Sequence, residues 1–416
     1  MNSQNTSNNI LSKIDDLNLK NLLQIQNIYE DNGFKIFLVG GAVRDALLGK
    51  KIKDFDLATD APLDFTKDAF RQVIPTGEDF GTLTLLLNDC EYEITRFRKD
   101  LDTDGRRATI IEFADTLEED VTRRDLTING LAFDIKNNEL IDYVNGLKDI
   151  KNKKINFIGN TADRIKEDQL RSLRFYRFLH RYPTFTSSKD TDAILTSITN
   201  LEIVSIERIF QELEKMLSYN IPVKDSVING LVNIGVLNRL GIDKKFSESF
   251  IILKKMFEYN SILPIIVTYY INHGFDTKKT IQTLKISKNY KYIFKVIDLI
   301  RENKKINPDI LLKSSMRYIS DKNELSVLFS IFNISFNSKL FDKILENNIP
   351  INISDLEING NDLIKLGFSG SEIKKQLNFL LSKVWIDDSL NQKNILLELI
   401  SKNNNKIIKN NKKMLK

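Results

Sequence analysis

The chain of 416 residues has one cysteine, two histidines, seven prolines and no long apolar run. A single Cys90 excludes an internal disulfide and is typical of a reducing compartment, so we expect a cytoplasmic protein. Two histidines, His180 and His273, are too few for a histidine-rich metal hydrolase unit. No segment approaches the roughly 20 apolar residues that a membrane-spanning helix requires, so we expect no membrane partner.

Neither sign of charge dominates the chain. It has 61 Lys and Arg against 56 Asp and Glu, a formal net charge of +5. This weakly favours an RNA partner, because a local basic stripe matters more than the total. Residues 1–20 begin with a polar stretch that lacks the basic and apolar parts of a secretory signal, and we expect them to be disordered. Residues 401–416 have lysines but no acids, and could contact RNA phosphates or form a frayed end.

The pattern of the chain changes at about Lys151. Before it, short strand and helix patterns alternate; after it, glycine and proline become sparse and the pattern turns helical. So long a chain is too large for one core. We therefore predict an α+β fold, with a mixed head of β-sheet and helices at 21–152 followed by an all-helical part.

A glycine pair, Gly40 and Gly41, stands between an apolar run and a helix-like segment. The run Phe34–Val39 predicts a buried strand, and Ala42–Leu48 predicts the first turns of a helix. Such a turn points unpaired N–H groups at open space and can bind an anion such as a triphosphate. Arg44, one turn into the helix, could add a guanidinium fork. The alternative is an ordinary tight turn.

Two carboxylates follow in the predicted strand 54–58. Because side chains alternate along a strand, Asp54 and Asp56 would share one face while Phe55 points into the core. Two like charges so close repel unless a cation lies between them, and Mg²⁺ prefers oxygen ligands and substrate phosphates. The pattern predicts a Mg²⁺ site held by Asp54 and Asp56, or else a solvated acidic edge.

Further candidates lie downstream. The runs Gly81–Leu87 and Tyr92–Phe97 predict a hairpin around Asn88-Asp89. Glu93, in the second run, could be a third catalytic carboxylate or an exposed strand residue. Adjacent Arg124 and Asp125 could fix a ribose or phosphate, or form a structural ion-pair cluster.

The segment Ala162–Leu179 predicts one amphipathic helix. A polar ridge runs along it, formed by Asp168, Arg171, Arg174 and Arg177. A carboxylate beside a guanidinium offers both an acceptor and donors, which reading a base edge without a template strand requires. The alternative is an exposed helix with i, i+3 salt bridges.

Six motifs in order resemble the class II tRNA nucleotidyltransferases, the bacterial CCA-adding enzymes and their poly(A) polymerase relatives. They are GGAVRD, DFD, TRFR, EEDVTRRDLTING, RIKEDQLRSLRF and IERIFQELEKML. The likeness runs from Phe34 to Leu217 and resumes at Glu357–Leu380. It departs at Leu126, Gly130 and Tyr143, which concern packing and turn shape more than chemistry.

The resemblance implies a polymerase-β-like nucleotidyltransferase head, a neck at 153–219, and a body and tail at 220–400 that grip tRNA. By position it implies that Asp54 and Asp56 bind the metal. It implies that the nucleotide contacts include Gly41, Arg44, Arg124, Asp168, Arg171, Arg174 and Arg177. Glu207, Arg208 and Glu212 would support the nucleotide-binding helix.

The expected activity is addition of CCA to the 3′ end of tRNA from CTP and ATP, by attack of the RNA 3′-hydroxyl on the α-phosphate. Alternatives are a poly(A) polymerase, a CC-only or A-only enzyme, and a catalytically silent RNA-binding protein. The segment Asp100–Glu119 has ordinary length, which favours full CCA addition, and Gly105 would let it move. The sequence predicts no oligomeric state.

Overall fold

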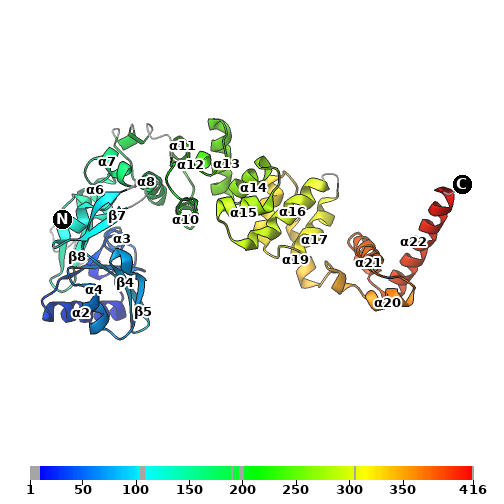
Figure 1. Cartoon of the computed structure of the whole chain (residues 1–416), viewed down its shortest axis with the longest axis horizontal. Coiled ribbons are helices and arrows are strands. Elements are labelled where there is room, and N and C mark those ends of the chain that lie inside the picture. The colour runs from blue at the N-terminus through cyan, green and yellow to red at the C-terminus, as the bar shows by residue number, and fades with distance from the viewer. Residues whose placement is uncertain are drawn as a thin grey trace. The chain divides into compact units, whose positions relative to one another are not determined.

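The computed structural model describes residues 10–103, 108–188, 191, 192, 194, 195, 201–303 and 306–414. Side chains are described for these residues except 100–103, 108–111, 289 and 404–414. The chain forms two compact units, Met1–Ile262 and Leu263–Lys416, and each is described by itself (Figure 1). Gly105, expected to let its segment move, lies outside the described residues.

A seven-stranded sheet forms the centre of the first unit, in the order β3-β4-β5-β2-β1-β8-β9. All neighbouring strands are antiparallel except β2 and β5, which are parallel. The strands are β1 Ile36–Val39, β2 Phe55–Thr59, β3 Val73–Gly77, β4 Thr82–Leu87, β5 Cys90–Arg96, β8 Leu131–Asp134 and β9 Glu139–Asp142. A separate two-stranded sheet pairs β6 Arg98–Thr103 with β7 Ala108–Phe113.

The helices of the head are short apart from the first. They are α2 Asp16–Asp31, α3 Gly41–Leu47, α4 Leu63–Ala69, α5 Leu117–Thr122 and α6 Gly146–Asn152. The predicted disorder of residues 1–20 is wrong from Ile10 onward. The Asp15 carboxylate accepts from the N–H of Asn18 and so caps α2, while Ile10 and Ile14 are buried. Residues 1–9 lie outside the described residues.

The predicted strand–turn–helix and hairpin are confirmed. β1 ends at Val39, and α3 starts at Gly41 directly after Gly40. β4 and β5 pair across Asn88 and Asp89, both of which have positive φ, as a tight two-residue hairpin turn requires. Because β2 and β5 are parallel and in register, Asp56 lies directly opposite Glu93.

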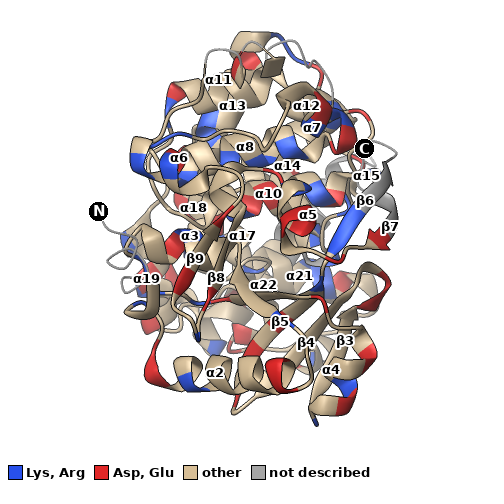
Figure 2. Ribbon diagram, turned by 90° about the vertical axis from the view of Figure 1, so that its left-hand side faces the viewer, with Lys and Arg blue, Asp and Glu red and all other residues tan. Residues whose placement is uncertain are grey.

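The helical part of the first unit contains α7 Thr161–Glu167, α8 Leu170–Arg181, α10 Ile206–Leu217, α11 Asp225–Asn233, α12 Val236–Arg239 and α13 Phe246–Glu258. The prediction of one helix over 162–179 is wrong, because the helix is interrupted at Asp168. That residue has extended backbone, φ −150°, and its carboxylate accepts from the N–H of Leu170 at 3.0 Å. A side-chain bond of this kind competes with helix continuation. In Figure 2 the ribbon of α8 carries blue segments that mark its basic residues.

The second unit is all helical over the residues described. Its α-helices are α14 Leu263–Asn272, α15 Thr277–Leu284, α16 Lys291–Glu302, α17 Pro308–Met316, α18 Lys322–Ile331, α19 Ser338–Glu346, α20 Gly360–Lys365, α21 Ser371–Val384 and α22 Lys393–Met414. The last helix extends to Met414 and so includes most of residues 401–416, which the sequence analysis treated as a separate lysine-rich end. Across the described residues, no helix has the length and apolar character to cross a membrane.

The predicted fold class, a mixed α+β head followed by helices, is confirmed. The first compact unit holds the head together with the helices up to Ile262, and so includes all of the expected neck. The subdivision at 152 and 219 stays a prediction.

Candidate active site

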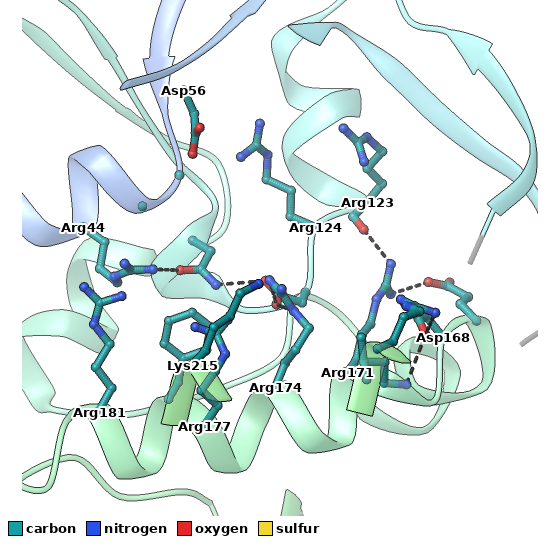
Figure 3. A pocket seen from close by; sticks show the side chains of 18 of the residues that line it. Arg44, Asp56, Arg123, Arg124, Asp168, Arg171, Arg174, Arg177, Arg181 and Lys215 are labelled. Atoms are coloured by element: carbon teal, nitrogen blue, oxygen red, sulfur yellow. Dashed lines mark hydrogen bonds and ion pairs between the residues drawn. The ribbon is translucent and has the colours of Figure 1, made fainter. Parts of the chain in front are cut away.

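A cavity of about 660 Å³ opens in the first unit, lined by residues of α3, of the segment that follows α5, and of helices α8 and α10. Figure 3 shows the arginines of α8 in a row along one wall, with Asp56, Arg124 and Arg123 on the opposite wall. Every predicted nucleotide-binding residue lines this cavity: Gly40, Gly41, Arg44, Arg124, Asp125, Asp168, Arg171, Arg174 and Arg177. Asp54 and Asp56 line it as well.

The glycine turn lies close beneath arginine side chains. Gly40 has φ +67°, and a Cβ built on it would stand 3.0 Å from a guanidinium nitrogen of Arg124. A side chain there would be strained and would crowd the arginine. The turn therefore brings backbone N–H groups and a cation to one spot, which suits a phosphate.

Arg44, predicted to contact a phosphate, is almost fully buried. Only 4 % of it is exposed; its guanidinium donates to Asp45 at 3.0 Å and also to Asn129 Oδ1, and it lies 5.0 Å from the ring centroid of Phe178. These contacts fix the guanidinium behind the glycine turn. Asp45 and Asn129 were not among the predicted site residues.

The carboxylate pair lies at the start of β2. Asp54 directly precedes the strand, Asp56 is on it, and Phe55 between them is buried, as expected from strand alternation. Burial raises the pKa of Asp56, and Asp54 adds to this while Arg124 opposes it. Burial also raises the pKa of Glu93, helped by Asp56 opposite.

These carboxylates suit a divalent cation. Among the described residues, Asp56 receives no hydrogen bond, although its side chain is half-buried beside Asp54. Burial first, and the neighbouring carboxylates second, raise the pKa values of Asp56 and Glu93, and a bound cation would stabilise the charged form of both groups. Glu93 does not line the main cavity but lines a smaller one of about 380 Å³ that also contains Asp54 and Asp56. Over the described ranges, no group of three His, Cys, Asp or Glu residues is close enough to hold a metal ion. A metal here would therefore be held by the aspartate pair, with water and phosphate completing its shell.

Arg123 and Arg124, the adjacent arginines of the EEDVTRRDLTING motif, are held by an acid that was not among the predicted site residues. Asp120 is fully buried and accepts from Arg123 at 2.6 Å and Arg124 at 2.9 Å. Burial alone would raise the pKa of Asp120, but the two guanidinium groups outweigh it and lower the pKa. The position of Asp120, three and four residues before these arginines, is the signal that could have identified it.

Asp125 joins the head to α8. Its carboxylate forms an ion pair with Arg174 at 2.7 Å and accepts from Asn129 at 2.9 Å. Burial alone would raise its pKa, but Arg174 and Asn129 together hold the pKa well below the usual range. The structural alternative of the sequence analysis, an ion-pair cluster, therefore exists, and it forms one wall of the cavity.

Asp168 and Arg171 both reach the cavity, but each has another partner. Arg208 of α10 donates to both oxygens of Asp168, at 2.7 and 3.3 Å. Arg171 forms an ion pair with Glu167 at 2.6 Å and donates to the carbonyl of Arg123 at 3.0 Å. Burial raises the pKa of Asp168 against the effect of Arg208.

The rest of the α8 row is supported from α10. The buried Glu212 lies 2.5 Å from Arg177 Nε and 3.7 Å from Arg174, in agreement with the expected supporting role of that motif. Arg181 and Lys215 also line the cavity, and neither is among the residues predicted from the sequence. Arg181 follows Arg177 by four residues and so lies on the same helix face as the ridge, so that helical periodicity could have indicated it.

Residues 36–156 match a family model described as the Poly A polymerase head domain. The chain is 31 % identical over 377 residues to the CCA-adding enzyme of Staphylococcus epidermidis, covering 89 % of this chain and 90 % of that relative. The chain belongs to the CCA-adding enzyme family. It is likewise 31 % identical over 368 residues to the mitochondrial CCA tRNA nucleotidyltransferase 1 of Danio rerio, covering 85 % of this chain and 84 % of that relative.

Solved structures of CCA-adding enzymes share the fold. The Bacillus stearothermophilus enzyme in complex with CTP has a TM-score of 0.71 at 23 % identity, covering 93 % of this chain and 98 % of that one. The Thermotoga maritima enzyme complexed with tRNA has a TM-score of 0.65 at 22 % identity, covering 95 % of this chain and 98 % of that one. The family resemblance expected from the motifs is confirmed, and the protein is a nucleotidyltransferase. The individual roles of the site residues stay predictions.

Proposed function

We propose that this member of the CCA-adding enzyme family acts in the cytoplasm and builds the 3′-CCA end of tRNA from CTP and ATP, with Mg²⁺ as cofactor. One observation carries the proposal. The carboxylate pair and the basic turn face the row of arginines on α8 across a single cavity. A nucleoside triphosphate has this same division, with its phosphates at one end and its base at the other.

The reaction needs little covalent chemistry from the protein. The RNA 3′-hydroxyl loses its proton to water and its oxygen forms a bond to the α-phosphorus. The bond from that phosphorus to the bridging oxygen of the β-phosphate breaks, and pyrophosphate leaves. Mg²⁺ held by Asp54 and Asp56 would supply Lewis-acid activation of the hydroxyl and charge neutralisation of the phosphates. The chain itself positions the reactants and stabilises charge.

The residues of the cavity divide this work. Gly40 and Gly41 allow close backbone approach to the triphosphate, and Arg124, fixed by Asp120, adds a positive charge beside Asp56. Asp168 and Arg171 present a carboxylate and a guanidinium at the α8 end, where the base edge would be read. Because Arg208 and Glu167 hold these two side chains, the base would meet groups that are already oriented.

The test is incorporation of one labelled nucleotide at a time into tRNA that lacks its last three nucleotides. With Mg²⁺ present we expect CTP to extend this tRNA and ATP to extend only tRNA that already ends in CC. With EDTA we expect no extension. Extension of the shortened tRNA by ATP alone into long tails would support a poly(A) polymerase, and no extension under any condition would support a silent RNA-binding protein.

A further inference from the structure

Asp45 lies one residue after Arg44 in α3. It joins the head to the end of α8 by hydrogen bonds and an ion pair. Its carboxylate accepts from Arg44 Nε at 3.0 Å, from Arg181 Nη2 at 2.6 Å and from the hydroxyl of Tyr182 at 2.8 Å. Two of these three donors stand about 136 positions away in the chain. The Asp45 side chain is only 18 % exposed, so water screens these contacts weakly.

A second ion pair joins the head to α8 two turns earlier. There Asp125 holds Arg174 at 2.7 Å. Arg174 and Arg181 are seven residues apart, about 10 Å along the helix. Asn129 links the two ion pairs, because it accepts a hydrogen bond from Arg44 and donates one to Asp125 at 2.9 Å.

Without Asp45, these polar contacts between α8 and the head would lie only near the start of the helix, at Arg171 and Arg174. The contact at Arg181 holds the opposite end as well and so fixes the tilt of α8 against the head. The glycine turn belongs to the same short helix as Asp45, and the expected base-reading residues stand at the other end of α8. The tilt of α8 therefore sets where a base edge lies once the phosphates are seated.

We propose that Asp45 is a positioning residue for base selection, which acts by fixing the tilt of α8 relative to the triphosphate turn. The proposal rests on the proposed function, since it requires that the base is read at α8. If Asp45 had a purely structural role, its replacement would have a different effect. Its loss would lower stability and rate without changing the preference among bases.

The experiment compares the full-length parent with Asp45→Asn, Tyr182→Phe and Arg181→Gln. For each, kcat/KM is measured for CTP and for UTP on tRNA lacking its CCA end, together with inhibition by inorganic tripolyphosphate. We expect Asp45→Asn to reduce the CTP-to-UTP ratio about tenfold, the equivalent of ~1.4 kcal/mol, while tripolyphosphate inhibition changes little. Tyr182→Phe removes one donor and keeps the ring, so we expect a reduction of about threefold in the same direction.

The remaining variants serve as coupling test and control. The double variant Asp45→Asn with Arg181→Gln should be no less selective than the less selective of the two single variants. Both substitutions break the same contact, the ion pair between Asp45 and Arg181. Asp134→Asn is the matched control: that buried head acid accepts from Gln26 and Asn137 outside the cavity, and its CTP-to-UTP ratio should equal that of the parent.

Three outcomes separate the possibilities. A parent that adds no nucleotide would overturn the proposed function itself. A parent that adds CCA, with variants that are slower but equally selective, would overturn the positioning role alone. Weaker tripolyphosphate inhibition at unchanged selectivity would overturn it too, because Asp45 would then act on the triphosphate turn. If Asp45→Asn does not fold, Tyr182→Phe and Arg181→Gln decide between these outcomes.

Discussion

Replacing Asp125 with Asn removes the charge that joins the head to α8 while keeping the size of the side chain. The carboxylate is 7 % exposed and receives the Nε and Nη2 groups of Arg174 at 2.8 and 2.7 Å. It also accepts from the N–H of Leu126 at 2.8 Å and from Asn129 at 2.9 Å. An amide in its place would retain part of these bonds but would leave Arg174 without its nearest counter-charge.

The cost follows from the burial of the pair. Removing one partner of a buried ion pair costs about 3–5 kcal/mol. Here Arg174 is 32 % exposed and Glu212 lies 3.7 Å away, so water and a second acid compensate in part. We therefore expect the free energy of unfolding to fall by about 2–3 kcal/mol. At about 2–4 °C per kcal/mol for a unit of this size, Tm should fall by roughly 4–12 °C.

The ion pair of Asp125 and Arg174 also makes the stability of the protein depend on pH. Burial raises the pKa of Asp125, but Arg174 and the hydrogen bonds outweigh it, so the folded-state pKa lies below the unfolded value. A depressed carboxyl pKa contributes stability that is present above the unfolded pKa of about 3.9 and is lost as pH falls toward the folded value. The Tm difference between parent and variant should therefore be full at neutral pH and shrink below about pH 4.

Thermal unfolding followed by circular dichroism at several pH values measures both effects. Asp142→Asn is the control, since Asp142 accepts only from backbone N–H groups of Val144, Gly146 and Leu147 in the contacts described for it. Its variant should lose less stability than Asp125→Asn. A Tm of Asp125→Asn equal to that of the parent at neutral pH, or a difference that does not change in acid, would refute the reasoning.

Three further predictions concern activity. Asp54→Ala and Asp56→Ala should each abolish nucleotide addition and leave tRNA binding largely intact; substantial activity in either variant, measured by labelled CTP incorporation, would reject the metal assignment. Asp168→Ala should alter the choice among the four nucleotides more than it weakens inhibition by tripolyphosphate; a lower rate with the same choice would indicate a structural role. Glu93→Gln should raise the Mg²⁺ concentration needed for half-maximal rate, because it removes a negative charge beside Asp56; an unchanged Mg²⁺ titration would exclude Glu93 from the site.

The local pattern of the chain predicted the head well. The strand before Gly40, the helix after it and the hairpin at Asn88-Asp89 all depend on short-range signals: apolar runs, glycine and turn residues. The alternation along β2 placed Phe55 in the core correctly. These features follow from backbone preferences that each segment carries by itself.

The helix break at Asp168 could not be predicted in the same way. The segment has a continuous helical pattern, and the break depends on a side chain that bonds to the backbone two residues later and to Arg208, forty positions away. Asp45 escaped prediction for the same reason, because its partners Arg181 and Tyr182 meet it only in the folded unit. Long-range ion pairs leave little trace in a single sequence.

Sequencing the 3′ ends of tRNA lacking its last three nucleotides, after incubation with the protein, Mg²⁺ and all four nucleoside triphosphates, tests the account most directly. The parent should yield ends that read CCA and stop, and Asp168→Ala should yield ends that contain U or G. Unextended ends or a run of A from the parent would contradict the account.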